Sequence, residues 1–298
     1  DSYHIGFMVG PRVNAAGRMS TPDIATRLLL ANDDSMETEA RALALQLDGE
    51  NVRRQEEEAG VLAAAKKMVT TDPEIGARSV IVVAGDGWHR GVVGIVASKL
   101  VDAFHRPAIV LSIEGDVAHG SCRSIPRFDM LGALERCAPL MIRFGGHRQA
   151  AGLTIDAARI RDLRLAVNDV ADETLAPEDL MPRLRIDGDL TFRSITGGVA
   201  AGVLAMAPFG AGNPRPVFAA RRVEIVDGPR KLKERHLKMS LKQDGRVFRA
   251  VAWRSAEQHD YLAEHKAALD VAFSLEHNHF NGETRVEMTL ASLKESGT

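Results

Sequence analysis

The sequence has few cysteines, no long apolar run and almost no net charge. Its two cysteines, Cys122 and Cys137, stand fifteen residues apart. That spacing fits neither a disulfide framework nor a zinc knuckle and predicts a reducing, cytoplasmic location. No apolar run approaches the roughly 18 residues that a membrane-spanning helix needs, so we expect no membrane partner. A formal charge of −2 gives no global sign of a polyanionic ligand, so any such sign must be local.

The chain starts without features of a targeting segment. Its first residues, Asp1-Ser2-Tyr3-His4, include neither Met nor a charged-then-apolar leader. We therefore expect no signal peptide, and we expect that further chain precedes Asp1. A length of 298 residues suits about two domains, and a hydrophobic content of 45% allows a real core.

Residues 33–69 have a helical pattern. Asp34 and Glu37 form a capping box, and apolar side chains follow at three- and four-residue steps. Two glycines weaken this pattern, but it still predicts one long helix. Residues 50–58 are almost all polar, which is typical of a strut between domains rather than of a core element.

An α/β domain is predicted next. Apolar, β-branched runs at 79–84 and 108–112 predict two buried strands, and the helix expected at 92–104 makes them a parallel βαβ unit. The remaining expected elements are strands near 118–121 and 151–155, helices at 130–142 and 159–171, and a linker at 176–182.

Beyond the linker the pattern becomes that of a β domain. Short alternating segments are separated by Asp-Gly, Asn-Gly and Gly-Pro turns, which predicts a small antiparallel barrel or sandwich. One helical insertion is expected near 198–206. The segments are 184–190, 217–226, 236–243, 246–253, 269–275 and 284–293.

Two glycine-rich clusters could bind an anion. In the first, Gly10 to Arg18, the side chains of Arg12, Asn14 and Arg18 offer forked donors that suit phosphate oxygens; the alternative is a turn with solvated arginines. The second, Gly85 to Gly91, precedes a helix whose first amides could hold an anion. It matches neither the dinucleotide fingerprint nor the Walker loop. Tight strand-to-helix packing explains its glycines equally well, and His89 could be a structural hydrogen-bonder.

A third cluster has two parts about 25 residues apart. Ser121, Arg123 and Ser124 offer hydroxyl and guanidinium donors after a strand, and Gly145-Gly146 would let a backbone approach a ligand before the imidazole of His147. The alternative is a turn followed by a histidine that caps a helix. Two such motifs in one small domain predict a shared anion pocket.

The β domain contains a strongly basic segment. Residues 215–254 hold 12 Lys or Arg and 4 Asp or Glu, a balance of +8 (12 − 4). This excess predicts a groove that follows a single-strand backbone; the alternative is a solvated strand face. Arg230, Lys231 and Lys233 are expected together on one loop. Candidates for base stacking, some of which must instead fill the interior, are Phe218, His236, Phe248 and Trp253.

These clusters, in this order, resemble the RecJ exonucleases of the DHH phosphoesterase superfamily. A further segment, 207–218, resembles the motif at that family's OB-fold, and the whole set covers essentially the entire chain. The resemblance implies the tail of a DHH catalytic domain at 1–20, a connecting helix at 21–70, an α/β DHHA1 domain with a mixed sheet and flanking helices at 71–181, and an OB-fold-like barrel at 182–298. The motifs are GPRVNAAGR (10–18), GWHRGVVGIVASKL (87–100), GSCRS (120–124), FGGHRQAAG (144–152) and APFGAGNPRPVF (207–218).

The resemblance also implies an activity: 5′→3′ hydrolysis of single-stranded DNA in repair and recombination, with Mn²⁺ or Mg²⁺. No Asp-His-His sequence occurs here, so we expect the metal ligands upstream of this chain, none within it, and no nuclease activity from it alone. His147 is the implied catalytic residue. Single-strand-binding proteins or helicases are the implied protein partners of a monomer. The implied phosphate and DNA contacts are Ser121, Arg123, Ser124, Gly145 and Gly146, with His89, Arg12, Asn14 and Arg18 beside them and Arg230, Lys231 and Lys233 on the barrel.

Other functions remain open from the residues. The chain could be a stand-alone single-strand-binding module. It could also be a DHH-type phosphodiesterase for oligonucleotides or cyclic dinucleotides, although a small substrate needs no extended basic groove. Alanyl-tRNA synthetase also uses a DHHA1 domain, but synthetase motifs are absent from this sequence.

Overall fold

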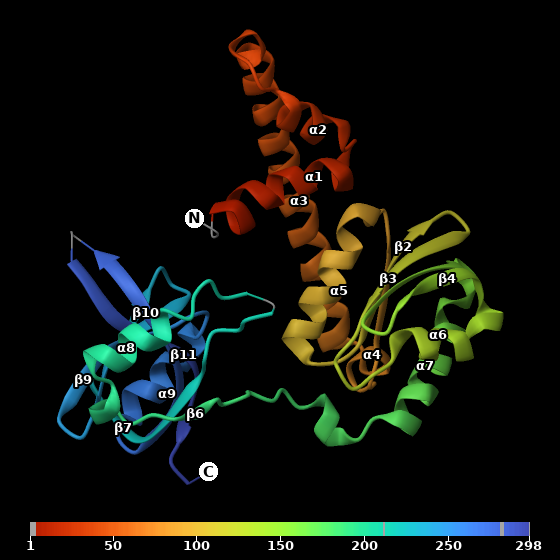
Figure 1. The fold of residues 1–298 in the computed structure, drawn as a ribbon. Helices are drawn as coiled ribbons and strands as arrows, with labels where there is room; N and C mark the ends of the chain where they lie inside the picture. Colours follow the sequence, from red (N-terminus) through yellow and green to blue (C-terminus); the bar gives the residue numbers. More distant parts are fainter. Residues whose placement is uncertain (1–3, 211, 281–282, 298) are drawn as a thin grey trace. The chain divides into compact units, whose positions relative to one another are not determined.

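The computed structural model describes residues 4–210, 212–280 and 283–297. The chain divides into two compact units, Asp1–Pro182 and Arg183–Thr298 (Figure 1). Each unit is described by itself. Residues 1–3 of the expected N-terminal tail, Ala211 of the 207–218 motif and the predicted Asn281-Gly282 turn lie outside the described residues.

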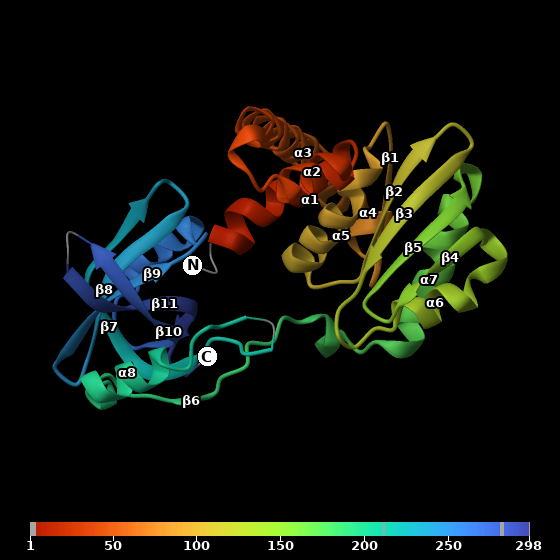
Figure 2. The same cartoon turned by 45° about the horizontal axis from the view of Figure 1, so that its top comes forward.

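The first unit begins with helices packed on one another (Figure 2). A small cluster that includes Ala16, Ile24, Leu43 and Leu47 joins them. The helices are η1 (His4–Val9), α1 (Gly10–Met19), α2 (Asp23–Leu30), the single turn η2 (Asp34–Met36) and α3 (Glu37–Thr71). The predicted long helix is therefore confirmed, and both glycines lie within α3.

The polar middle of α3 is largely exposed, as the sequence predicted, but one side of it is buried. Asn51 and Glu58 are only 4% and 5% exposed. The Glu58 carboxylate accepts a 2.7 Å hydrogen bond from Arg54 and also pairs with Lys99 of the following domain. Polarity alone could not reveal this, because the partner that buries these groups is distant in sequence.

A five-stranded sheet forms the centre of the first unit, in the order β1-β2-β3-β5-β4. The predicted parallel pairing of β1 with β2 is confirmed, and the other pairs are antiparallel. The sheet is therefore mixed, as expected. The strands are β1 (Ile81–Asp86), β2 (Ala108–Glu114), β3 (Val117–Arg123), β4 (Met141–His147) and β5 (Ala150–Asp156).

Helices cover this sheet on both faces. One core cluster joins α5 and α3 to the sheet through residues such as Val83 and Val96, and the other joins α6 and α7 through residues such as Leu134 and Leu163. The helices are α4 (Pro73–Gly76), α5 (Arg90–Phe104), α6 (Met130–Arg136) and α7 (Ile160–Thr174), with the short turns η3 (Ala138–Leu140), η4 (Ala157–Arg159) and η5 (Pro177–Leu180).

The helix predicted at 130–142 is partly wrong. It ends at Arg136, and after the turn η3, which contains Pro139, the chain enters β4. The Phe-Gly-Gly-His segment therefore lies on a strand, and His147 pairs with Ala150 of β5 rather than capping a helix. Cross-strand pairing with a later segment decided this, and the glycine-rich sequence gives little strand signal of its own.

The second unit is a closed barrel. Its strands follow the order β7-β8-β9-β11-β10, and a β10–β7 pairing closes the ring, with β6 added beside β7. Of the two predicted alternatives, the barrel is correct, but it is not wholly antiparallel as predicted, because β9 pairs with β11 in parallel. The interior is filled by Phe192, Phe273 and aliphatic side chains. The strands are β6 (Gly188–Asp189), β7 (Phe218–Leu232), β8 (His236–Gln243), β9 (Arg246–Ala252), β10 (Leu269–Phe280) and β11 (Glu283–Glu295).

Two helices accompany the barrel. The predicted insertion is α8 (Gly197–Leu204), whereas α9 (His259–Glu264), between β9 and β10, was not predicted from the sequence. With six residues and only Leu262 fully buried, α9 is too short for a helical hydrophobic pattern to be detected. The turns η6 (Phe192–Ser194) and η7 (Ala256–Gln258) complete the unit.

Candidate nucleic-acid interface

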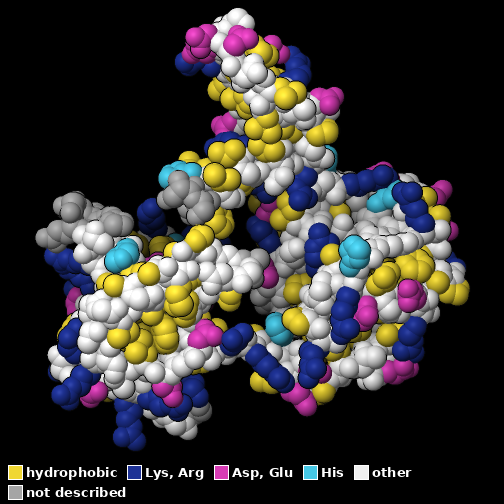
Figure 3. Space-filling model, viewed as in Figure 1, with side chains coloured by type: hydrophobic (Ala, Val, Ile, Leu, Met, Phe, Trp, Pro, Cys, Tyr) yellow, Lys and Arg dark blue, Asp and Glu magenta, His cyan; other side chains and the backbone are white. Residues whose placement is uncertain are grey.

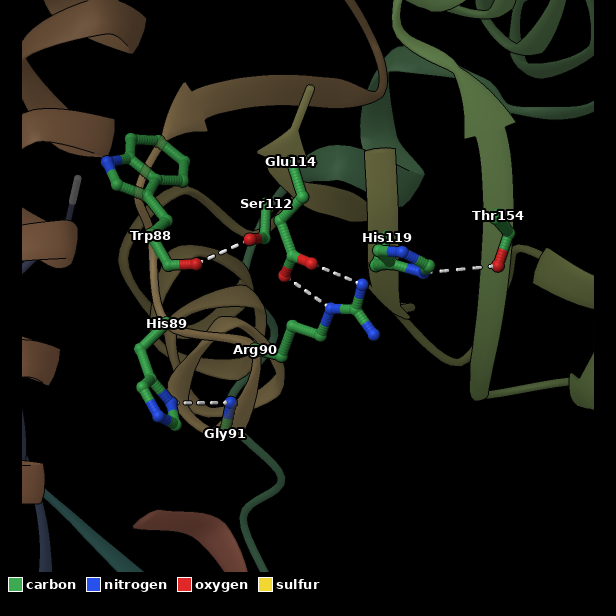
Figure 4. Close-up of polar contacts among 8 residues, drawn as sticks. All are labelled: Trp88, His89, Arg90, Gly91, Ser112, Glu114, His119 and Thr154. Carbon is green, nitrogen blue, oxygen red and sulfur yellow. Dashed lines mark hydrogen bonds and ion pairs between the residues drawn. The ribbon is translucent and has the colours of Figure 1, made fainter. Parts of the chain in front are cut away.

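The loop between β1 and α5 is shaped by packing. A Cβ on Gly85 would stand 2.3 Å from the indole of Trp88, and the Trp88 carbonyl accepts a 2.5 Å hydrogen bond from the Ser112 hydroxyl (Figure 4). His89 is the N-cap of α5, because its Nδ1 accepts from the Gly91 amide at 3.0 Å. The tight-packing and structural alternatives for this loop therefore have direct support. Since Nδ1 accepts, the ring proton of a neutral His89 sits on Nε2.

The first two glycine-rich clusters, Gly10 to Arg18 and Gly85 to Gly91, contact each other. A Cβ on Gly91 would stand 2.1 Å from the carbonyl oxygen of Arg18, and the Arg18 guanidinium donates to the Gly91 carbonyl at 3.1 Å. Arg12 points elsewhere: it pairs with Asp48 of α3 at 2.8 Å and also donates to the Met8 carbonyl. Asn14 is exposed on α1. The contact at Gly91 thus brings Arg18 beside His89, while Arg12 helps to hold α1 against α3.

Helix α5 also lies against the Ser-x-Arg motif of β3. At Gly94 a Cβ would stand 3.3 Å from a guanidinium nitrogen of Arg123 and 3.4 Å from Oγ of Ser121. Both side chains therefore occupy the face of the sheet that carries α5. The hydroxyl of Ser124 is turned away and donates to the Phe128 carbonyl at 2.8 Å.

Strand register places the third cluster in rows across the sheet. Arg123 on β3 pairs with Ala150 on β5, and Ala150 pairs with His147 on β4. The next row contains Ser121, Gly152 and Gly145 in the same way. Opposed residues in a sheet point to the same face. Arg123 and His147 therefore lie on either side of Ala150. The neighbouring row, which contains Gly145 and Gly152, forms a glycine floor beside them.

The backbone of the folded protein requires a glycine at position 146 but not at position 145. Gly146 has φ of +147°, and its Cβ would stand 2.5 Å from Ala150. At Gly145 no atom lies within 4 Å of the Cβ position. Folding therefore explains Gly146, whereas Gly145 leaves open space over the sheet.

A third row was missed in the sequence. His119, Thr154 and Arg143 are aligned across β3, β5 and β4 and line a hollow of about 350 Å³ together with Gly145 and Gly152. Arg143 donates to Thr154 Oγ1 at 3.1 Å, and that oxygen lies 3.4 Å from Nδ1 of His119. A signal was available, because His119 and Arg143 stand two residues before Ser121 and Gly145, and strand side chains repeat every two residues.

An ion pair between Arg90 and Glu114 lies near this row. The Arg90 guanidinium binds the Glu114 carboxylate through two 2.5 Å contacts, which lower the pKa of Glu114. Burial, followed by the charge of Arg90, lowers the pKa of His119 below its ordinary value. This shift favours the neutral form of His119, whose ring lies between Arg90 and Thr154 (Figure 4). Figure 3 shows Lys and Arg side chains interspersed with Asp and Glu over this unit, with histidines among them.

The barrel presents a basic face on β8 and β9. On β8, Leu237, Met239 and Leu241 are buried, so Lys238 and Lys242 alternate outward. Arg249 of β9 pairs with Ser240 and Arg230 of β7 pairs with Lys238, which puts their side chains on the same outer surface. These side chains line a hollow of about 410 Å³ with Asp227, Lys231 and Leu232.

The loop expected to hold Arg230, Lys231 and Lys233 is a hairpin. Arg230 and Lys231 belong to β7, whereas Lys233 lies in the turn before β8 with φ of 49°. All three are exposed, and Arg230 contacts Asp227 at 2.5 Å. The strand runs farther than predicted because it continues past the cis peptide bond at Gly228-Pro229.

The aromatic candidates separate into interior and surface groups. Phe218 and Phe248 pack against Phe273 and Phe192 of the barrel interior. Trp253 is 52% exposed just after β9 and makes an edge contact with His236 at 4.7 Å. Because His236 begins β8 next to the basic hairpin, Trp253 is the candidate that lies beside the basic groups.

The described residues do not fit a metal centre. In residues 4–210, 212–280 and 283–297, no three His, Cys, Asp or Glu side chains come together. Within the same residues no helix is both long enough and apolar enough to cross a membrane.

Both units match known domain families. Residues 77–173 match the DHHA1 domain, and residues 186–292 match the RecJ OB domain. The chain is 37% identical over 257 residues to the single-stranded-DNA-specific exonuclease RecJ of Bacillus subtilis, covering 85% of this chain and 32% of that protein. For the RecJ of Dickeya dadantii, the identity is 33%, with 97% of this chain and 51% of that protein covered.

Solved structures agree with these matches. RecJ from Thermus thermophilus in complex with Mn²⁺ superposes with a TM-score of 0.80 at 30% identity and covers 100% of this chain but 42% of that chain. The chain thus spans about half or less of the relatives that it matches.

Proposed function

Because the chain carries the DHHA1 and OB domains of the RecJ-type exonucleases, we propose that the protein hydrolyses single-stranded DNA from the 5′ end and that this chain supplies surfaces that hold the strand. One observation supports this most strongly: the exposed basic face of β8 and β9, ending at Trp253. The second and third strands of an OB-fold are the surface that binds oligonucleotides. Lysine and arginine attract the phosphates there, and an exposed indole can stack on a base.

The DHHA1 sheet supports a second contact, to the terminal phosphate. Arg123 and Ser121 share a face with the glycine floor. His147 stands at the far side of the same face. In this proposal the guanidinium and hydroxyl donate to phosphate oxygens, Gly145 admits the backbone of the strand while Gly146 shapes β4 beside it, and His147 acts near the scissile bond. The proposal assigns Arg18 and His89, which meet at Gly91, to the edge of the pocket, and Asn14, Arg12 and Ser124 to positions farther from the ligand.

The remaining parts of the proposal rest on the relatives. Solved RecJ structures contain Mg²⁺ or Mn²⁺, so we assign divalent metal ions to the whole protein, with ligands outside the described residues. A role in repair and recombination, a cytoplasmic location, a monomeric state, and single-strand-binding proteins or helicases as partners belong to the same proposal. So do the domain limits 1–20, 21–70, 71–181 and 182–298.

The barrel face can be tested by charge reversal in the full chain. Affinity for a short oligo-dT should fall with salt at a log–log slope of roughly −3, at about −0.7 per phosphate neutralised. Reversing Arg230, Lys231 and Lys233, or Lys238 and Arg249, to Glu should weaken binding and flatten that slope. Fluorescence anisotropy at several salt concentrations measures both. Lys266→Glu, an exposed residue before β10, is the control and should bind like the parent.

Two outcomes would contradict this role. A slope near zero would mean that phosphates are not bound. Equal affinity for duplex would mean that unpaired bases are not stacked.

A further inference from the structure

The row formed by His119, Thr154 and Arg143 lies one step beyond the pocket proposed for the terminal phosphate. Along β4, His147, Gly145 and Arg143 are spaced two residues apart on one face. Two residues of a strand advance about 6.6 Å, which is of the order of the separation between successive phosphates in an extended single strand. A strand that lies along β4 would thus pass from His147 over Gly145 to Arg143.

Among the described residues, little stands over the two glycines of this path. The Cβ position of Gly145 has no atom within 4 Å, and that of Gly152 has only the Gly120 carbonyl, at 3.6 Å. The hollow of about 350 Å³ is bordered by the side chains of the third row. A floor without side chains between two basic rows leaves room for the sugar and base that join two phosphates.

Arg143 has the charge and the orientation to bind the second phosphate. Its Nε is held by Thr154 Oγ1 at 3.1 Å, and no carboxylate pairs with it in the part of the chain that the structure describes. The nearby Arg90 charge is instead matched by Glu114. The forked terminal nitrogens of Arg143 are therefore available to phosphate oxygens.

We propose that Arg143, held by Thr154 and bordered by His119, forms a second subsite that binds the phosphodiester following the 5′-terminal nucleotide. This inference rests on the proposed function, because the first phosphate must lie at Arg123 and Ser121, which leaves His147 between the two phosphates and near the scissile bond. Arg143 is the binding residue. Thr154 is a positioning residue, which fixes the plane of the guanidinium.

Two ligands of different length separate this subsite from the first pocket. Thymidine 5′-monophosphate reaches only the first row, whereas the 5′-phosphorylated dinucleotide pTpT reaches both. A dinucleotide is also shorter than the roughly 4–16 nucleotides that one OB-fold binds, so the barrel adds little. We expect pTpT to bind the full chain at least about tenfold more tightly than the mononucleotide, as one charge-assisted contact provides.

Arg143→Ala should remove that gain and leave mononucleotide affinity unchanged, and it should reduce the salt slope for pTpT by about 0.7. Thr154→Val should lose part of the additional affinity for pTpT, and Arg143→Lys should retain part of that additional affinity. Arg161→Ala, which removes an exposed arginine of α7, is the matched control and should bind like the parent. Thermal unfolding verifies that each variant is folded.

The outcomes are distinguishable. If the mononucleotide binds and Arg123→Ala abolishes its binding, but pTpT gains nothing or keeps its gain in Arg143→Ala, the second subsite is wrong and the first pocket stands. If neither ligand binds, or Arg123→Ala has no effect, the phosphate pocket itself is wrong and the subsite falls with it.

Discussion

Two glycines of the first unit show how a residue can be required for different reasons. Gly91 lies where the carbonyl of Arg18 approaches α5, so a side chain there collides with backbone. Gly145 faces open space on the sheet, so a methyl group there meets nothing. The first glycine holds two elements together, and the second leaves room for a ligand.

This contrast predicts opposite effects of the same substitution. Gly91→Ala should destabilise the first unit by about 1–3 kcal/mol, the range for overpacking, because backbone at 2.1 Å cannot yield as a side chain can. Gly145→Ala should unfold like the parent but bind 5′-phosphorylated oligonucleotides more weakly. Urea unfolding and anisotropy measure the two effects. Parent-like stability of Gly91→Ala, or parent-like binding by Gly145→Ala, would contradict the respective role.

At the scale of elements, α3 is joined to α5 by buried charge. Glu58 lies on α3 with a side-chain exposure of 7%, between Arg54 of the same helix and Lys99 of α5. Breaking a buried pair leaves an uncompensated charge. The long helix is therefore fixed to the DHHA1 sheet by a specific contact in addition to apolar packing at residues such as Val61 and Ala65.

Removing this carboxylate should be costly. Glu58→Ala is expected to lower the free energy of unfolding by about 3 kcal/mol, the lower end for a buried pair that loses one partner. Glu57→Ala, an exposed neighbour, should change it by less than about 0.5 kcal/mol. Urea unfolding at pH 7 compares the two. Similar midpoints for both variants would show that the pair contributes nothing to the attachment of α3.

At the scale of the whole molecule, binding and hydrolysis are expected to separate. Both units carry basic surfaces that suit a single strand, but carboxylates and imidazoles do not converge on one point within the described residues. We expect this chain to bind labelled single-stranded DNA without releasing mononucleotides when Mn²⁺ is added, since metal-activated water is the usual nucleophile for such hydrolysis. A full-length relative is the positive control. Robust mononucleotide release by this chain would contradict the assignment of catalysis to other parts of the protein.

The sequence alone determined many of the local elements and which residues carry charge. The β-branched runs identified β1 and β2, the alternating segments identified the barrel class, and the excess of Lys and Arg at 215–254 identified the basic face. These features were predictable because strand periodicity and charge are properties of neighbouring residues.

The tertiary structure decided what those residues contact. It turned Arg12 toward Asp48, buried Glu58 beside Lys99, made β4 a strand, and aligned His119 with Thr154 and Arg143. Local pattern does not give these contacts: the side-chain partners are 11 or more residues apart in the chain, and β4 is a strand because it pairs with β5. Sequence periodicity fixes the face on which a side chain lies, but only the register between strands and the packing of helices decides what lies opposite to it.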